Sequence, residues 1–251
     1  MKNFGMQLFS ILYHFVYVLS NPVYSFLRKY FLQYRQIKAH FGKIKMCLKE
    51  EYQMIIPAHF EDLHTHHVGT TPNRSYFIPA STRMDDLVEH REHSDRFQLL
   101  NGNWKFKYCE SIHDFEELFY EQNFDASNWD TIPVPSVWQN HGYDRHQYTN
   151  IRYPFPADPP YVPYENPCGA YLTDFEYAMN PDAPKAYLNF EGVDSCFYVW
   201  LNGQYLGYSE VSHSTSEFDI TETVQEGKNT LAVLVLKWCD GSYLEDQDKF
   251  R

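Results

Sequence analysis

Short apolar runs separated by Pro, Asn and Gly dominate the sequence from about Ala58 onward. Runs of this length between turn-forming residues are typical of β-strands, whereas helices need longer segments with apolar residues three and four positions apart. A helical spacing does occur at residues 112–120, where Phe115, Leu118 and Phe119 share a face, and it predicts a short helix. Strands are expected over residues 97–108, 186–190, 196–201, 204–208 and 230–238.

Three features of this pattern indicate the fold class. Asn202-Gly203, between two expected strands, is the dipeptide favoured by type I′ hairpin turns, in which both central residues need positive φ. Residues 230–238 (TLAVLVLKW) are apolar nearly throughout, as in a strand buried on both faces. The proline-rich segment 132–167 cannot lie in a central strand, because each proline removes a ladder donor, so long ordered connections are expected there. The sequence predicts an all-β protein, a β-sandwich or jelly roll.

Composition agrees with a folded β protein and charge limits its partners. The chain has 251 residues, 43% of them hydrophobic and 18% aromatic, which excludes global disorder and collagen-like classes. The net charge of −12 is uneven, because residues 1–50 hold eight Lys/Arg and one Glu, whereas the remainder holds thirteen Lys/Arg and thirty-two Asp/Glu. So acidic a body would repel phosphate backbones, and we expect no nucleic-acid partner for it.

The first fifty residues differ from the rest. Residues 4–19 are mostly apolar but short for a membrane span, and a basic, aromatic segment follows them. Three interpretations stay open: a membrane or interfacial anchor, a weak signal peptide, and a poorly structured upstream extension. All but the second predict a cytoplasmic body. We divide the chain into a basic and apolar extension, residues 1–57, for which a helical conformation is kept open, and a β domain, residues 58–251.

Few residues stand out as chemical groups by spacing alone. The cysteines at 47, 109, 168, 196 and 239 form no CxxC pair and are odd in number, which favours buried thiols over disulfides or a zinc site. His64, His66 and His67 have no ligand-spaced partner nearby in sequence and indicate a polar loop. Residues 240–248 carry four carboxylates, which could suit a hard cation but by spacing alone favour an acidic surface loop.

Long ordered strings then carry a resemblance. LLNGNWKFKY, NWDTIPVPSVWQNHGYDRHQYTNIRYPF, DPPYVPYENPCGAY, FEGVDSCFYVWLNGQYLGYSEVSHSTSEFDIT and KNTLAVLVLKWCDGSYLEDQDKFR together resemble the amino-terminal region of the β-galactosidases of glycoside hydrolase family 2. The resemblance is continuous over residues 100–251 and looser from about Phe60.

The resemblance implies a jelly-roll sugar-binding domain that contributes to a β-galactoside site in carbohydrate metabolism. Asn150, in QYTN, matches a family Asn that reaches the galactose subsite, and its amide can both donate to and accept from hydroxyls. Asp248, in LEDQD, matches a family Asp that contacts galactose and helps to hold a sodium ion. In the family, a separate barrel supplies the catalytic pair of glutamates for retaining hydrolysis, and its magnesium. No catalytic residue is therefore expected in this chain, which should be inactive alone.

The sequence also departs from the family. Lys249-Phe250 stands where members usually have an apolar residue and Trp, and the family continues into another strand of this domain, so we expect a domain truncated at its C-terminal end with an exposed sheet edge. The expected partners are β-galactosides, with a barrel-containing chain or a homo-oligomer as open alternatives. A non-catalytic carbohydrate-binding or assembly module, and an inactive gene fragment, remain competing interpretations.

Overall fold

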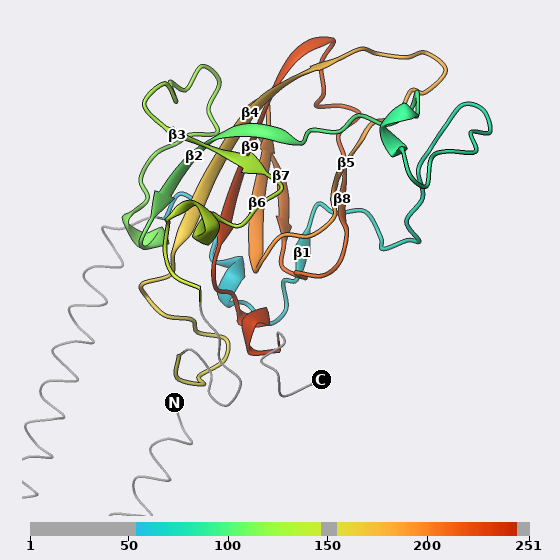
Figure 1. Ribbon diagram of the computed structural model, residues 1–251. Coiled ribbons are helices and arrows are strands. Elements are labelled where there is room, and N and C mark those ends of the chain that lie inside the picture. Colours follow the sequence, from blue (N-terminus) through green and yellow to red (C-terminus); the bar gives the residue numbers. More distant parts are fainter. Residues whose placement is uncertain (1–53, 147–154, 245–251) are drawn as a thin grey trace, which may run out of the picture. The chain divides into compact units, whose positions relative to one another are not determined.

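A computed structural model describes residues 54–146 and 155–244 (Figure 1). The chain divides into two compact units, Met1–Gln53 and Met54–Arg251. The membrane-contact prediction for residues 4–19 falls outside the described residues, as do the site predictions Asn150 and Asp248. The described strands are β1 (His67–Val68), β2 (Gly102–Cys109), β3 (Asp130–Val134), β4 (Cys168–Tyr177), β5 (Tyr187–Phe190), β6 (Cys196–Leu201), β7 (Gln204–Ser209), β8 (Ser216–Asp219) and β9 (Gly227–Leu236).

Short 3₁₀ turns are the helical elements of the described part: η1 (His59–Glu61), η2 (Arg91–His93), η3 (Ile112–Asp114), η4 (Trp138–His141) and η5 (Asp240–Tyr243). The predicted helix at residues 112–120 is wrong beyond the η3 turn. Phe115 and Phe119 are buried as predicted, but Leu118 is exposed, and the Phe119 ring packs edge-on against Trp200. These aromatic side chains reach the sheet from irregular backbone, so their spacing three and four residues apart does not reflect a helix.

One large antiparallel sheet organises the described domain. Its strand order is β1-β7-β6-β9-β4-β2-β3, and a second sheet pairs β5 with β8. The central strand β9 pairs along its length with β4 on one side, and from Leu231 to Leu236 with β6 on the other. Pro133 lies in β3, an edge strand, where a missing donor costs no ladder bond.

Both faces of the large sheet are buried. Along β9, Leu231, Val233 and Val235 point to one hydrophobic cluster, and the alternate residues point to the other, as the two-residue period of a strand requires. The first cluster includes Leu188 of β5 and Phe218 of β8, so the small sheet covers this face. Irregular segments, with Phe60 and Trp129 among their buried residues, cover the other face. The predicted all-β sandwich and its doubly buried strand are confirmed.

Two positions, one in a turn and one in a strand, show where backbone geometry selects the residue. Asn202 and Gly203 join β6 to β7 with φ of 53° and 83°, which confirms the predicted hairpin turn. Gly207 lies in β7 at φ +155°, and a Cβ atom there would stand 1.8 Å from the carbonyl oxygen of Val68. Strand β1 can therefore approach β7 only because residue 207 has no side chain.

Candidate functional site

Described residues that flank the two predicted sugar-binding residues meet at the same end of the large sheet. Phe155 follows Asn150 by five residues, and Tyr243 precedes Asp248 by five. The Phe155 ring packs edge-on against Tyr243, with ring centroids 5.3 Å apart, and also against Trp238 at 5.1 Å. The described residues five positions away from each predicted site residue therefore share one aromatic contact.

Tyr243 is the centre of this anchor. Its hydroxyl donates to the carbonyl oxygen of Tyr161 (2.5 Å) and accepts a hydrogen bond from the amide of Asp158 (3.0 Å). Asn166 and Trp238 are linked twice, because the Asn166 amide donates to the Trp238 carbonyl (2.8 Å) and its side-chain oxygen accepts from the Trp238 backbone (3.0 Å). The connection 155–167 is therefore docked on residues 237–243, and the predicted long ordered connection is confirmed in this part (Figure 1).

On the N-terminal side of residues 147–154, an ion pair makes a further link to the same place. The Lys237 ammonium group contacts the Asp144 carboxylate, and both side chains are largely buried. Lys237 directly follows β9. Residues on both sides of the segment that carries Asn150 are thus fastened to the residues that follow the central strand.

Three titratable side chains meet at this end of the sheet, and they form the acid cluster: His66, Glu210 and Asp240. Strand topology brings them together. Strands β7 and β9 run in the same direction because each is antiparallel to β6 between them, so Glu210 and Asp240 follow strands that leave the sheet at the same end. His66 precedes β1, whose His67 pairs with Ser209, and this register places His66 beside Glu210.

The acid cluster is buried on its carboxylate side. Glu210 and Asp240 are 5% and 4% exposed, the Tyr208 hydroxyl donates to Glu210 (2.9 Å), and the exposed His66 ring contacts the other Glu210 oxygen. Asp240 Oδ1 is buried and has no hydrogen-bond partner among the described residues. Burial, together with the nearby Glu210 carboxyl, raises the pKa of Asp240 to about 7, whereas the hydrogen bond to Glu210 raises the pKa of His66.

This arrangement differs from the sequence interpretation in two respects. Asp240, at the start of the predicted acidic surface loop, is buried in η5. The three histidines do not form a plain polar loop, because His67 belongs to β1 and His66 faces two carboxylates distant in sequence. The sequence did not point to Glu210, since its partners are brought to it only by strand register.

The ligand atoms of the acid cluster lie within 4.8 Å of one another, and one imidazole with two carboxylates is a donor set able to hold a divalent cation.

Comparison with known proteins supplies the family. The model of the sugar-binding domain of glycosyl hydrolases family 2 matches residues 97–251. The chain belongs to this family. A β-galactosidase of Actinobacillus pleuropneumoniae is 52% identical over 198 residues, which are 79% of this chain and 19% of that protein. A β-galactosidase of Staphylococcus xylosus is 47% identical over 192 residues, which are 76% of this chain and 19% of that protein.

The chain therefore spans about a fifth of the length of these curated relatives, 19% in each case. Among solved structures, a β-glucuronidase of an uncultured Clostridium sp. is 25% identical with a TM-score of 0.40, and covers 54% of this chain and 21% of that one. A Bifidobacterium dentium β-glucuronidase complexed with coumarin-3-O-glucuronide is 20% identical with a TM-score of 0.41, over 55% of this chain and 19% of that one.

Two further sequence predictions can be set against the structure. Cys109, Cys168, Cys196 and Cys239 are free thiols, and all but Cys109 are buried. In residues 54–146 and 155–244, no helix is both long and apolar enough to cross a bilayer. The cytoplasmic location stays a prediction from the sequence.

Proposed function

We propose that this domain supplies part of the galactose subsite of a β-galactosidase, with Asn150 and Asp248 as the residues that contact the sugar. The observation that carries the proposal is the shared anchor. The segments bearing both residues leave from the Phe155–Tyr243 contact, in a chain whose family is that of sugar-binding domains and whose relatives include β-galactosidases. An amide and a carboxylate offered from one end of a sandwich suit the hydroxyls of a sugar.

The proposal assigns no bond-breaking step to this chain. Retaining glycoside hydrolysis needs two carboxyl groups about 5–5.5 Å apart across the scissile bond, one as acid and base and one as nucleophile. Glu210 and Asp240 have oxygen atoms within 4.8 Å of each other, but both side chains are buried among protein atoms, so a sugar has no access to the pair. Hydrolysis of β-galactosides is therefore assigned to a barrel that joins this domain, and a sodium ion at Asp248 belongs to the same proposal.

The sharpest experiment restores activity by assembly. The chain is mixed with a version of the Actinobacillus pleuropneumoniae β-galactosidase that lacks the region matched here, and hydrolysis of a chromogenic β-galactoside is followed. We expect no hydrolysis by this chain alone, activity in the mixture, and at least a 10-fold lower rate with Asp248→Ala or Asn150→Ala. The exposed Asp85→Asn is the matched control and should restore activity like the unmodified chain.

A sugar titration separates this proposal from a self-sufficient carbohydrate-binding module. An isolated part of a subsite lacks walls and polar contacts, so galactose should change tryptophan fluorescence only in the millimolar range. Saturation at micromolar galactose, unaffected by Asp248→Ala, would favour the module. Hydrolysis of a β-galactoside by the purified chain itself, persisting through repeated purification, would contradict the proposal that the barrel carries out the reaction.

A further inference from the structure

An exposed histidine cluster lies far along the chain from the sugar-site segments, on the connection between β1 and β2. It comprises His90, Glu92 and His93, around the η2 turn. Its backbone is held by local hydrogen bonds: the His90 amide donates to the Asp86 carbonyl (2.8 Å), and the His93 amide donates to the His90 carbonyl (3.0 Å). The turn is therefore a defined scaffold for the side chains it carries.

Side-chain contacts fasten this turn to its surroundings and orient it. The Arg91 guanidinium donates to the Glu191 carboxylate (2.5 Å) and to the Tyr76 hydroxyl (3.0 Å). Ser94, which is buried, donates to the carbonyl of Pro79. These two residues tie the turn down, while the side chains of the histidine cluster stay exposed to solvent.

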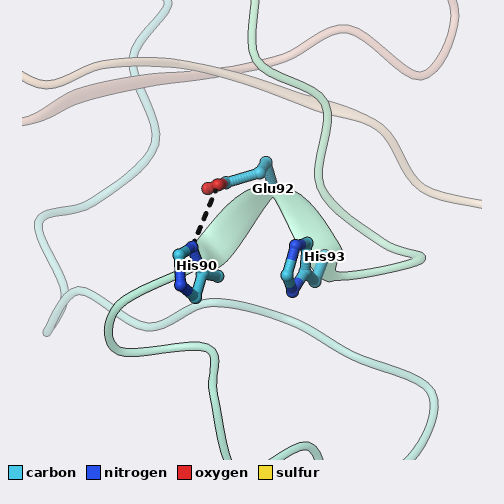
Figure 2. A group of neighbouring side chains, drawn as sticks. All are labelled: His90, Glu92 and His93. Atoms are coloured by element: carbon cyan, nitrogen blue, oxygen red, sulfur yellow. Dashed lines mark hydrogen bonds and ion pairs between the residues drawn. The ribbon is translucent and has the colours of Figure 1, made fainter.

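The three exposed side chains converge. Figure 2 shows the imidazole rings of His90 and His93 face to face, with the Glu92 carboxylate reaching toward His90. The ring centroids are 4.9 Å apart at an interplanar angle of 21°, and His90 Nδ1 lies 3.4 Å from Glu92 Oε1. The ligand atoms of all three residues lie within 4.8 Å of one another.

A fourth residue completes the pattern expected around a metal. Asp86 Oδ2 lies 2.7 Å from His93 Nδ1. A carboxylate that holds one ring nitrogen of a histidine fixes the ring and leaves the other nitrogen with its lone pair available, which is the usual second partner of a metal-bound imidazole. Asp86 is therefore the positioning residue of the cluster, and with Nδ1 of His93 held by Asp86, Nε2 is the nitrogen that we assign to a metal.

We propose that His90, Glu92 and His93 form a surface site for a borderline divalent cation, with Zn²⁺ as the best match. On a tetrahedral zinc ion with bonds of about 2.0–2.1 Å, ligand atoms stand about 3.4 Å apart. His90 Nδ1 and Glu92 Oε1 already have that separation of 3.4 Å, and because the ligand atoms of the cluster lie within 4.8 Å of one another, a His93 nitrogen has at most about 1.4 Å to close. Two imidazoles among three ligands select Zn²⁺, Ni²⁺ or Cu²⁺ over Mg²⁺ and Ca²⁺. Water fills the remaining position.

The site is tested with ZnCl₂ alone, titrated calorimetrically into the full chain after chelator treatment at pH 7.5. We expect the double variant His90→Gln/His93→Gln to bind one zinc equivalent fewer than the unmodified chain. Asp86→Asn should keep the stoichiometry but weaken that equivalent about 10-fold, because it removes only the positioning carboxylate. Melting temperatures in EDTA should be unchanged in these variants, since all of the substituted side chains are exposed.

Two controls separate this site from other zinc-binding histidines. His146→Gln, at an exposed position outside any described cluster of metal-ligating groups, should leave the titration unchanged. His66→Gln reports on the acid cluster and should not remove the same equivalent. The proposal would be overturned if the double variant bound zinc with the same stoichiometry and affinity as the unmodified chain. It would also be overturned if His66→Gln removed the zinc equivalent that is assigned here to His90, Glu92 and His93.

Discussion

At the scale of single residues, Asp240 is a carboxyl group held in an environment far from that of water. Its carboxyl is buried, its Oδ1 has no hydrogen-bond partner among the described residues, and its pKa is raised to about 7. In the unfolded chain this carboxyl ionises near its ordinary value of 3.8. Between these two values the unfolded state loses a proton that the folded state keeps, so the Asp240 contribution to stability falls as pH rises from about 4 to about 7.

Asp240→Asn should remove this pH-dependent cost. The asparagine amide can donate to Glu210, and it has no proton to lose. We expect the variant to gain about 1–3 kcal/mol relative to the unmodified chain at pH 8, the order of the penalty for a buried unsatisfied group, and the gain to vanish near pH 4. Urea unfolding at both pH values in EDTA measures it. Asp85→Asn, an exposed control, should follow the unmodified chain, and parallel pH profiles for Asp240→Asn and that control would contradict the assignment.

The acid cluster also marks the limit of prediction from sequence. Asp240 and His66 were noticed, yet their neighbours in the chain gave no reason to bury one or to pair the other. Their partner Glu210 is 144 residues from His66 and becomes a neighbour only through the β1–β7 register. The sugar-site residues were different, since only the family resemblance pointed to them, and Asn150 and Asp248 lie outside the described residues.

At the scale of elements, five of the nine described strands (β2, β5, β6, β7 and β9) could be predicted because they are short apolar runs between turn-forming residues. Continuous apolar runs predict β6 and β9, and the dipeptide Asn202-Gly203 predicts the hairpin turn between β6 and β7. β1, with only two residues, has no period to detect. It forms because β7 has an edge open for pairing on the side away from β6, and because Gly207 leaves room for a close approach. Both are properties of the folded sheet.

Gly207→Ala tests that close approach. The new Cβ would overlap the Val68 carbonyl, so β1 should detach and the variant should lose about 2–4 kcal/mol, from backbone strain together with overpacking. Hydrogen exchange of the β1–β7 amides and urea unfolding report the two effects. Gly102→Ala is a matched control at a similar φ of +147° but with open space around the Cβ, and it should cost only the strain and leave β1 protected. Equal losses in both variants would exclude the steric explanation.

At the scale of the whole molecule, Tyr243 joins the fold to the proposed site. Its hydroxyl holds the connection 155–167, and its ring packs on Phe155, so it holds the described residues next to the predicted sugar-binding residues. Tyr243→Phe should cost only about 1 kcal/mol of stability, yet lower the rate restored in the assembly experiment several-fold. The exposed Tyr164→Phe should change neither quantity. A Tyr243→Phe chain that restores full activity would show that this hydroxyl has no role in positioning.

The place of β9 in the chain has a consequence for biosynthesis. The two halves of the large sheet, β1-β7-β6 and β4-β2-β3, meet only through this strand, which is the last of the described strands to leave the ribosome. Until residues 227–236 emerge, a nascent chain carries two apolar edges with nothing between them. Protease protection of stalled nascent chains should therefore appear abruptly once β9 clears the exit tunnel, and chaperones that bind open strand edges should be needed most just before that point.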